Sequence, residues 1–349
     1  MRVLLTGHRG YIGTVMTPML LAAGHEVVGI DTDLYQRCTF GDGFPTIPTI
    51  QKDIRDVVAA DINGFEAILH LAGLSNDPLG DLNPSLTFDI NYKASVRLAE
   101  LAKQVGVERF IFSSSCSNYG AAGDAPVNET SEFNPVTPYG SSKAMTEMDV
   151  TKMADDSFSP TFLRSATAYG VSPRLRFDLV LNNLVAWAIT TGKVHIKSDG
   201  TPWRPIVHIE DISRAFLAVL HAPRALIHNE SFNVGRTQEN YRISEIADIV
   251  KATVPGCEIE YAEDAGPDLR CYRVDCEKIA KTLPEFQPQW TAKKGAEELY
   301  NTYKKVGLTL DEFEGERYKR IAHIKYLISD GLLDQNLRWQ QAVLTPLVV

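Results

Sequence analysis

The amino-acid sequence predicts an α/β fold in which helices cover both faces of a parallel sheet. Short apolar runs recur up to about residue 165, and stretches with helical spacing, such as 91–105 and 143–154, separate them. The runs at 67–71, 109–113 and 161–164 are typical of strands buried in a parallel sheet. This alternation indicates a Rossmann-type doubly wound parallel sheet, followed by a smaller, discontinuous C-terminal α/β substrate domain.

A glycine-rich turn joins the first predicted strand, 3–5, to the first predicted helix, 12–23. Gly7, Gly10 and Gly13 stand in this turn. Because glycine has no Cβ, the turn can be sharp and its backbone can approach a pyrophosphate closely. The phosphates would bind at the positive N-terminus of the helix. The turn therefore predicts a dinucleotide site.

Acidic residues after the second predicted strand, 26–30, decide which dinucleotide is expected. Asp31 follows this strand, where a carboxylate can bind the ribose hydroxyls of NAD. Asp31 would also repel the 2′-phosphate of NADP, and Asp33 adds a second negative charge. Arg9 favours the opposite choice, since its guanidinium could bind that phosphate. NAD is the expected cofactor, with NADP as the alternative.

Composition narrows the function classes. Of 349 residues, 44% are hydrophobic and 23% are charged, which is ordinary for a globular protein. A net charge of −9 argues against a broad contact with nucleic acid or an anionic membrane. The five cysteines lack C-x-x-C spacing, so no disulfide framework or metal site is expected. No signal peptide or 18-residue apolar run is evident, and a cytoplasmic location is expected.

The sequence pattern changes after Gly170. Residues 1–170 are expected to form the NAD-binding domain, 171–305 the substrate-binding domain and 306–349 a helical tail. The stretch 209–221 has helical spacing and could return to the first domain, which would then include parts of 205–235. The tail is charged and carries aromatic residues. It could pack as helices or bind a partner, and the sequence leaves both possibilities open.

Tyr139 and Lys143 are the candidate catalytic pair. Four residues separate them, so on a helix they share one face. A nearby ammonium and the positive nicotinamide ring favour the phenolate and lower the pKa of the tyrosine from about 10. The phenolate could accept a hydroxyl proton while hydride leaves for the nicotinamide. Ser115, at the end of a predicted strand, would hold the reacting oxygen. The competing interpretation is an ordinary Tyr-Lys pair on the surface of a helix.

At this point the chain resembles the extended short-chain dehydrogenase/reductases, in particular the nucleotide-sugar epimerases and dehydratases of the UDP-galactose 4-epimerase-like kind. The resemblance covers residues 1 to about 300. It rests on the following motifs of this sequence: T-G-x-x-G-x-x-G at 6–13, D-I-R at 53–55, L-A-G at 71–73, Asn91, S-S-S at 113–115 before Y-G at 119–120, P-Y-G-S-S-K at 138–143, and W-R-P-I-V-H-I-E-D at 203–211.

The resemblance implies roles by position. Ser115, Tyr139 and Lys143 would form the catalytic triad. The expected cofactor-binding residues are Gly7, Arg9, Gly10, Tyr11, Ile12, Gly13, Asp31, Asp53, Ile54, Leu71, Ala72, Gly73, Asn91, Ser113, Tyr139 and Lys143. The expected contacts with a nucleoside-diphosphate sugar are Asn76, Ser115, Cys116, Ser117, Thr167, Asn183, Arg204 and Arg270. The resemblance also implies a homodimer through a four-helix bundle formed by the helices at 91–105 and 143–154.

The two residues after Ser115 distinguish reactions within the resembled family. Its 4,6-dehydratases carry a glutamate at the position of Ser117, often beside an aspartate, and its decarboxylases also carry that glutamate. These carboxylates serve as acid and base, and Cys116 and Ser117 cannot easily replace them. The sequence therefore favours a 4-epimerase, which oxidises and re-reduces C4. An NAD(P)H-dependent 4-ketoreductase is the main alternative, a dehydratase a weaker one, and a non-catalytic cofactor-binding regulator the weakest.

Several positions depart from the resembled family or are open to two interpretations. Cys116 could deprotonate a carbon beside a ketone, but a buried small residue is the commoner use of cysteine. Thr167 stands where asparagine is usual in the family. The remaining open assignments are Asn76 and Asp77 as sugar contacts or an ordinary turn, Arg270 or Arg273 as a phosphate ligand, and Arg174 and Arg176 as phosphate ligands or surface residues.

Overall fold

The computed structural model describes residues 1–75, 77, 83–266 and 271–340. Its centre is a parallel sheet of seven strands in the order β11-β7-β5-β4-β1-β2-β3. The strands are β1 Arg2–Thr6, β2 Glu26–Asp31, β3 Thr49–Gln51, β4 Ala67–His70, β5 Arg109–Ser115, β7 Ser159–Ser165 and β11 Glu230–Val234. The chain order reverses between β1 and β4, where doubly wound sheets bind ligands. The predicted fold class is confirmed.

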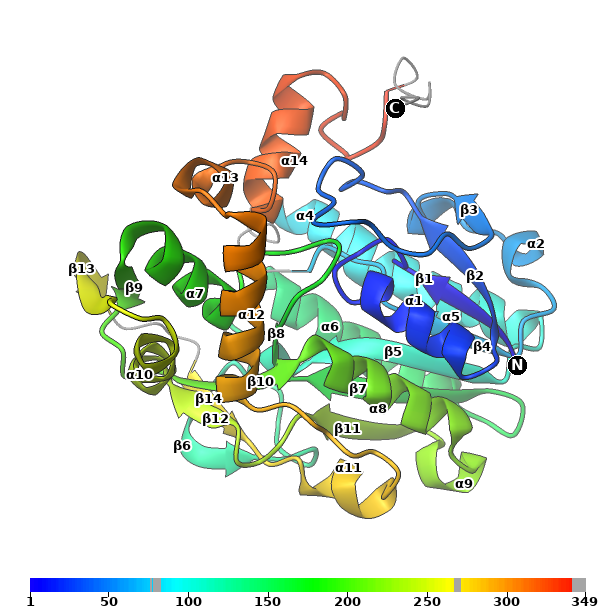
Figure 1. Ribbon diagram of the computed structural model, residues 1–349. Coiled ribbons are helices and arrows are strands. Elements are labelled where there is room, and N and C mark those ends of the chain that lie inside the picture. The colour runs from blue at the N-terminus through cyan, green and yellow to red at the C-terminus, as the bar shows by residue number, and fades with distance from the viewer. Residues whose placement is uncertain (76, 78–82, 267–270, 341–349) are drawn as a thin grey trace.

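Helices cover both faces of this sheet. Figure 1 shows α1 (Gly13–Ala22) and α8 (Ile209–His221) in front of it, and α5 (Ala94–Gln104) and α6 (Pro138–Val150) behind. Alternate strand residues supply the two cores, because successive side chains point to opposite faces. In β1, for example, Val3 and Leu5 pack on the side of α1 and α8, and Leu4 packs on the other side.

Two helices differ from their expected bounds. α6 begins at Pro138, five residues before the expected start, because the Thr137 hydroxyl caps it by accepting from the Gly140 N–H at 3.1 Å. This start places Tyr139 in the first turn of the helix. The expected helix at 91–105 becomes α5 preceded by α4 (Pro84–Thr87) and a π-helical turn, η2 (Phe88–Lys93).

A second layer packs around its own apolar core beside the sheet. Its main elements are α7 (Val180–Thr191), β9 (Lys193–Ser198), α10 (Ile243–Thr253), β13 (Glu258–Gly266) and α12 (Ala292–Val306). β10 (Trp203–His208) pairs with β8 (Thr167–Tyr169) and β12 (Asn240–Arg242), and β14 (Cys271–Val274) pairs with β6 (Ala121–Val127). The short elements are η1 (Ile54–Asp56), α2 (Ala59–Ile62), η3 (Cys116–Tyr119), η4 (Thr151–Met153), α9 (Arg224–Ile227) and α11 (Glu277–Thr282).

The chain leaves the central sheet and returns to it. After β10, α8 packs on the sheet and β11 adds to its edge beside β7. The described tail packs as helices: Phe313 of α13 (Leu310–Glu314) enters the second core, while Ile324 and Leu327 of α14 (Arg320–Ser329) enter the core behind the sheet.

None of the helices in the described ranges is both long enough and apolar enough to cross a membrane. The cytoplasmic location stays a prediction.

A buried charge network fixes α6 against the sheet. The Glu147 carboxylate of α6 forms an ion pair with the Arg164 guanidinium of β7 at 2.7 Å, and both side chains are at most 6% exposed. The same carboxylate accepts from Ser114 of β5 and, at 2.9 Å, from Asn118 of η3. Because α6 carries Tyr139 and Lys143, this network sets their position relative to the end of β5.

We expect Glu147→Ala to lower the free energy of unfolding by about 3–5 kcal/mol, because it leaves Arg164 as an uncompensated buried charge. Urea unfolding of the purified variant measures the change. Glu258→Ala is the matched control, because Glu258 forms an exposed ion pair with Lys251 and should matter little. Equal stability of both variants would contradict the assigned role of the network.

Candidate active site

A narrow cavity lies at the carboxyl ends of β1, β2 and β4. Every expected cofactor residue lines it except Asn91, Ser113, Tyr139 and Lys143. Its glycine turn requires glycine: Gly7 has φ +72°, and a Cβ there would lie 2.8 Å from the Ala72 nitrogen. A Cβ on Gly13 would lie 2.5 Å from the Gly7 oxygen. The turn therefore places backbone without side chains at the cavity wall in front of α1. This arrangement fits a dinucleotide diphosphate.

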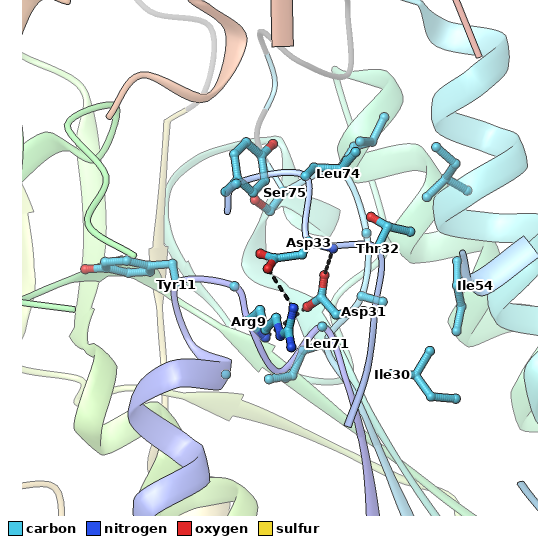
Figure 2. A pocket seen from close by; sticks show the side chains of 18 of the residues that line it. Arg9, Tyr11, Ile30, Asp31, Thr32, Asp33, Ile54, Leu71, Leu74 and Ser75 are labelled. Carbon is cyan, nitrogen blue, oxygen red and sulfur yellow. Dashed lines mark hydrogen bonds and ion pairs between the residues drawn. The ribbon is translucent and has the colours of Figure 1, made fainter. Parts of the chain in front are cut away.

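At the acidic end of this cavity, backbone N–H groups hold the carboxylate of Asp31 (Figure 2). Asp31 accepts from the Arg9 N–H at 2.9 Å and from the Asp33 N–H at 2.7 Å. Burial raises the pKa of Asp31, and these two hydrogen bonds oppose the rise. The Arg9 guanidinium pairs with Asp33 at 2.7 Å, and Arg174 pairs with the same carboxylate at 3.0 Å. Because Arg9 is paired with a carboxylate, the site favours the ribose hydroxyls of NAD over a 2′-phosphate.

A buried hydrogen-bond chain holds the loop after β4. The N–H of Ala72 donates to the Thr6 hydroxyl at 3.2 Å, and that hydroxyl bonds His70 Nδ1 at 2.6 Å. His70 Nε2 lies 2.8 Å from the Ser95 hydroxyl, which donates to the Asn91 carbonyl. Burial lowers the pKa of His70 to about 3, so the ring is neutral at pH 7. The loop that lines the cavity is thus fixed by neutral groups.

The hydrogen bonds of Asn91 indicate a role other than the expected cofactor contact, which stays a prediction. Its side chain is fully buried and clamps the backbone of Leu74, accepting from the N–H at 2.7 Å and donating to the carbonyl at 2.9 Å. It lines neither cavity. Asn91 is therefore a positioning residue for the loop containing Gly73, because its hydrogen-bonding groups are used by that loop.

The expected triad lies together in a larger, adjoining cavity of about 790 Å³. Ser115 is the last residue of β5, and Tyr139 and Lys143 face it from α6. The Tyr139 hydroxyl lies close enough to Ser115 for the serine to lower its pKa. Lys143 Nζ donates to the Ser113 carbonyl at 2.8 Å and lies 5.9 Å from the centre of the Tyr139 ring. The two cavities share Gly73 among other wall residues, so they adjoin at the triad.

Burial shifts the pKa of both candidate catalytic side chains. It raises the pKa of Tyr139 to about 12, and the nearby Ser115 hydroxyl only partly opposes this. It lowers the pKa of Lys143 to about 8, partly offset by Glu147. In the protein alone, the pKa of Tyr139 is therefore raised, whereas the sequence predicts a lowered pKa. The reason is that loss of water disfavours the phenolate.

The structure brings several expected substrate residues to the larger cavity. Its walls include Ser117, Thr167, Asn183 and Arg204. Arg204 is buried and donates to the Trp203 carbonyl at 2.8 Å. Two of the expected contacts, Asn76 and Arg270, lie outside the described residues.

Cys116 does not line the cavity. Its thiol is buried and donates to the Arg164 carbonyl at 3.1 Å. Burial raises the pKa of this thiol well above its ordinary value. The possible roles of Cys116 as a base or substrate contact are therefore corrected: it is a protonated, buried packing residue.

The structure places three charged residues whose roles the sequence leaves open, and two of them, Arg176 and Asp77, line the cavities. Arg174 and Arg176 are both buried rather than surface residues. Arg176 pairs with Asp178 at 2.7 Å and lines both cavities. Asp77 lines the larger cavity and accepts from the Thr137 hydroxyl at 2.7 Å.

Among the cavity residues that sequence reasoning missed, three come from distant parts of the chain. Tyr272 lines the larger cavity together with Ser117. Arg320 and Leu337 line the narrow cavity from the tail. The sequence carries no local signal for these residues, because their approach to the site depends on long-range packing.

Comparison with known proteins establishes the family. A family model described as the NAD dependent epimerase/dehydratase family matches residues 3–235. The chain belongs to this family and is an NAD-dependent enzyme, as the resemblance implies. The UDP-glucose 4-epimerase of Bacillus subtilis (strain 168) is 28% identical over 330 residues, 86% of this chain and 94% of that protein. The UDP-glucuronic acid decarboxylase 1 of Arabidopsis thaliana is 25% identical, over 90% of this chain and 72% of that protein.

Solved structures share the fold. UDP-glucose 4-epimerase from Thermotoga maritima has a TM-score of 0.76 at 24% identity, covering 88% of this chain and 100% of that one. The dTDP-glucose 4,6-dehydratase DesIV from Streptomyces venezuelae has a TM-score of 0.75 at 23% identity, covering 87% of this chain and 97% of that one. The same architecture therefore supports both kinds of reaction, and the site must decide between them.

We expect Lys143→Met to abolish turnover and to raise the free energy of unfolding at pH 7 by on the order of 1–3 kcal/mol, because it removes a buried charge. In the parent protein, the folded state loses the Lys143 proton near pH 8 and the unfolded state near pH 10.5. The parent therefore gains stability with rising pH between these values, and the advantage of the variant shrinks. Thermal unfolding at pH 7 and pH 9.5 measures this.

The control for this comparison is Lys152→Met. Lys152 is exposed and pairs with Asp149, so its replacement should not produce the pH-dependent difference. A Lys143→Met variant whose stability relative to the parent is the same at both pH values would contradict the lowered pKa.

Proposed function

We propose that the protein is an NAD-dependent nucleotide-sugar 4-epimerase that oxidises C4 of the sugar and reduces the ketone from the opposite face. The observation that supports this most directly is the absence of a carboxylate at the two positions after Ser115. Cys116 is buried there and Ser117 carries only a hydroxyl. Several curated relatives carry the name UDP-glucose 4-epimerase at 27–29% identity.

The other carboxylates near the triad do not replace that missing pair. The carboxylates that line the larger cavity, among the described residues, are those of Asp77 and Asp178. Asp178 pairs with Arg176, and Asp77 accepts from Thr137. An elimination needs an acid and a base free to exchange protons with the sugar. These two carboxylates are already engaged, which favours epimerisation over dehydration.

The chain's own groups would perform the proton transfer. Ser115 and Tyr139 both line the larger cavity, so a sugar hydroxyl between them would meet an acceptor and a donor. Bound NAD supplies the hydride acceptor. Tyr139 would act as the phenolate, which the cationic Lys143 beside it and the positive nicotinamide ring of bound NAD favour. The phenolate takes the hydroxyl proton during oxidation and the phenol returns it during reduction. The volume of about 790 Å³ gives the keto sugar space to turn between the two steps.

We expect Tyr139→Phe to lower turnover by about 10²–10⁴-fold, the usual contribution of a positioned acid–base group. Its NAD content should match that of the parent, because only one hydroxyl is removed. Tyr300→Phe, at a half-buried tyrosine of α12 that lines neither cavity, is the control and should retain activity. Substantial turnover by Tyr139→Phe would contradict the proton-transfer role.

The reaction itself is tested with the purified protein before cofactor is added. We expect released NAD on denaturation, and a rise in absorbance at 340 nm with conversion to the 4-epimer when UDP-, dTDP-, GDP- or CDP-sugars are supplied. NMR of the product sugar identifies the changed carbon. A protein that oxidises added NADH or NADPH only with a 4-keto nucleotide sugar would instead be a 4-ketoreductase.

We propose further that the protein is a homodimer through α5 and α6. Two apolar side chains of α6, Met145 and Met148, are 38% and 54% exposed, and their three-residue spacing puts them on one face. A second copy would cover this face in a four-helix bundle.

We expect Met148→Glu to shift the protein from dimer to monomer in sedimentation experiments, because a charge would be buried in the interface. Leu226→Glu introduces the same charge at an exposed leucine of α9 and should leave the dimer intact. Dissociation by both variants, or by neither, would argue against the bundle.

A further inference from the structure

The chain after α13 reaches back to the narrow cofactor cavity. Residues 318–340, which include α14, are called the C-terminal segment below. Figure 1 shows α14, in orange-red, and the chain that follows it beside the blue loop after β2. Arg320 and Leu337 of this segment line the cofactor cavity. The family model ends at residue 235, so membership of the family assigns the segment no role.

Polar contacts tie the C-terminal segment to the two loops that carry the cofactor residues. They are Trp339 Nε1 to the Thr32 carbonyl at 2.8 Å, Arg55 Nη2 to the Asn336 carbonyl at 2.8 Å, and Arg338 to Asp53 at 3.2 Å. One loop follows Asp31 and the other contains Ile54. The segment is therefore fixed to both loops at the acidic end of the cavity.

Apolar packing supports the same placement. Leu337 belongs to the cluster that contains Ile54 and Ile30, both of which line the cofactor cavity. Leu337 has φ +57°, a conformation that is strained for a branched side chain. The surrounding contacts hold the residue in this conformation, with its side chain in the cavity wall.

Arg320 carries the observation that points to a ligand. The side chain is 2% exposed, its guanidinium carbon lies 3.8 Å from the centre of the Tyr35 ring, and Nη2 donates to the Arg174 carbonyl at 2.8 Å. Its Nη1 is buried and has no hydrogen-bond partner among the described residues. A buried donor without an acceptor is costly. Because Arg320 lines the cavity, a molecule bound there could supply the acceptor that Nη1 lacks.

The charge of Arg320 is also distinctive among the arginines that surround the cavity. Arg9 and Arg174 pair with Asp33, and Arg176 pairs with Asp178. No carboxylate in the described ranges forms an ion pair with Arg320. An uncompensated guanidinium in a low-dielectric wall is stabilised by hydrogen-bond acceptors, and at the acidic end of the cavity a dinucleotide presents the acceptor atoms of its ribose and base.

We propose that the C-terminal segment completes the NAD site, with Arg320 donating to the dinucleotide through Nη1 and Leu337 forming an apolar wall against it. The segment thereby slows release of the cofactor, because NAD cannot leave past it without disturbing its contacts. This inference rests on the NAD dependence of the family and is independent of which sugar reaction the enzyme performs.

The test compares Arg320→Met with Arg317→Met, using NAD alone as the probe. Methionine preserves much of the packing on Tyr35 and removes the charge and the donor. Arg317 is an exposed arginine next to the segment that bonds the Thr39 carbonyl at 2.7 Å and does not line the cavity. We expect Arg320→Met to weaken NAD binding roughly tenfold or more by calorimetry, the usual effect of losing a hydrogen bond to a charged group. Arg317→Met should bind NAD like the parent.

Leu337→Ala tests the same inference without touching the buried arginine. We expect it to release NAD faster and to be purified with less NAD. If Arg320→Met and Leu337→Ala both retain the NAD content and affinity of Arg317→Met, the proposal is overturned and the segment serves only to pack. If the parent protein itself binds no NAD, the cofactor assignment fails, a result distinct from failure of the sugar reaction.

Discussion

The site depends on the buried carboxylate of Glu147. This one group joins α6 to three neighbours in the sheet layer: Arg164 of β7, Ser114 of β5 and Asn118 of η3. Desolvating an ion pair is costly, and only several well-placed hydrogen bonds make it tolerable. Few other arrangements of these side chains would satisfy the same hydrogen bonds. The network therefore fixes the helix that carries Tyr139 and Lys143 at one register against the strand that ends in Ser115.

Burial has a different consequence at each of the two cavities. Around the triad, it raises the pKa of Tyr139 and lowers that of Lys143, so the resting protein keeps the phenol neutral. Around the cofactor cavity, arginine and aspartate side chains pair with one another, and Arg320 is the exception. Low local dielectric strengthens the effect of any charge that a bound dinucleotide or sugar brings into these cavities. The charges of a bound ligand should therefore act strongly on the side chains that line these cavities.

The local part of the site follows from sequence patterns. The positions of Gly7, Gly13 and Asp31 follow from spacing after a strand, and those of Tyr139 and Lys143 from spacing on a helix. Boundaries were less predictable: α6 starts earlier than expected because the cap at Thr137 is a local hydrogen bond that apolar periodicity does not reveal. The domain limits and the roles of individual site residues stay predictions, since the comparisons establish the family and the fold.

The sequence by itself determined the parallel sheet, the glycine turn for a dinucleotide and the spacing of the catalytic pair, because these depend on residues close together in the chain. Only the tertiary structure decided that Asn91 clamps the loop containing Gly73, that Cys116 faces the core, and that Arg320 reaches the cofactor cavity. These outcomes depend on contacts between residues far apart in the chain. Burial and hydrogen-bond partners are set by such contacts, so no local pattern specifies them.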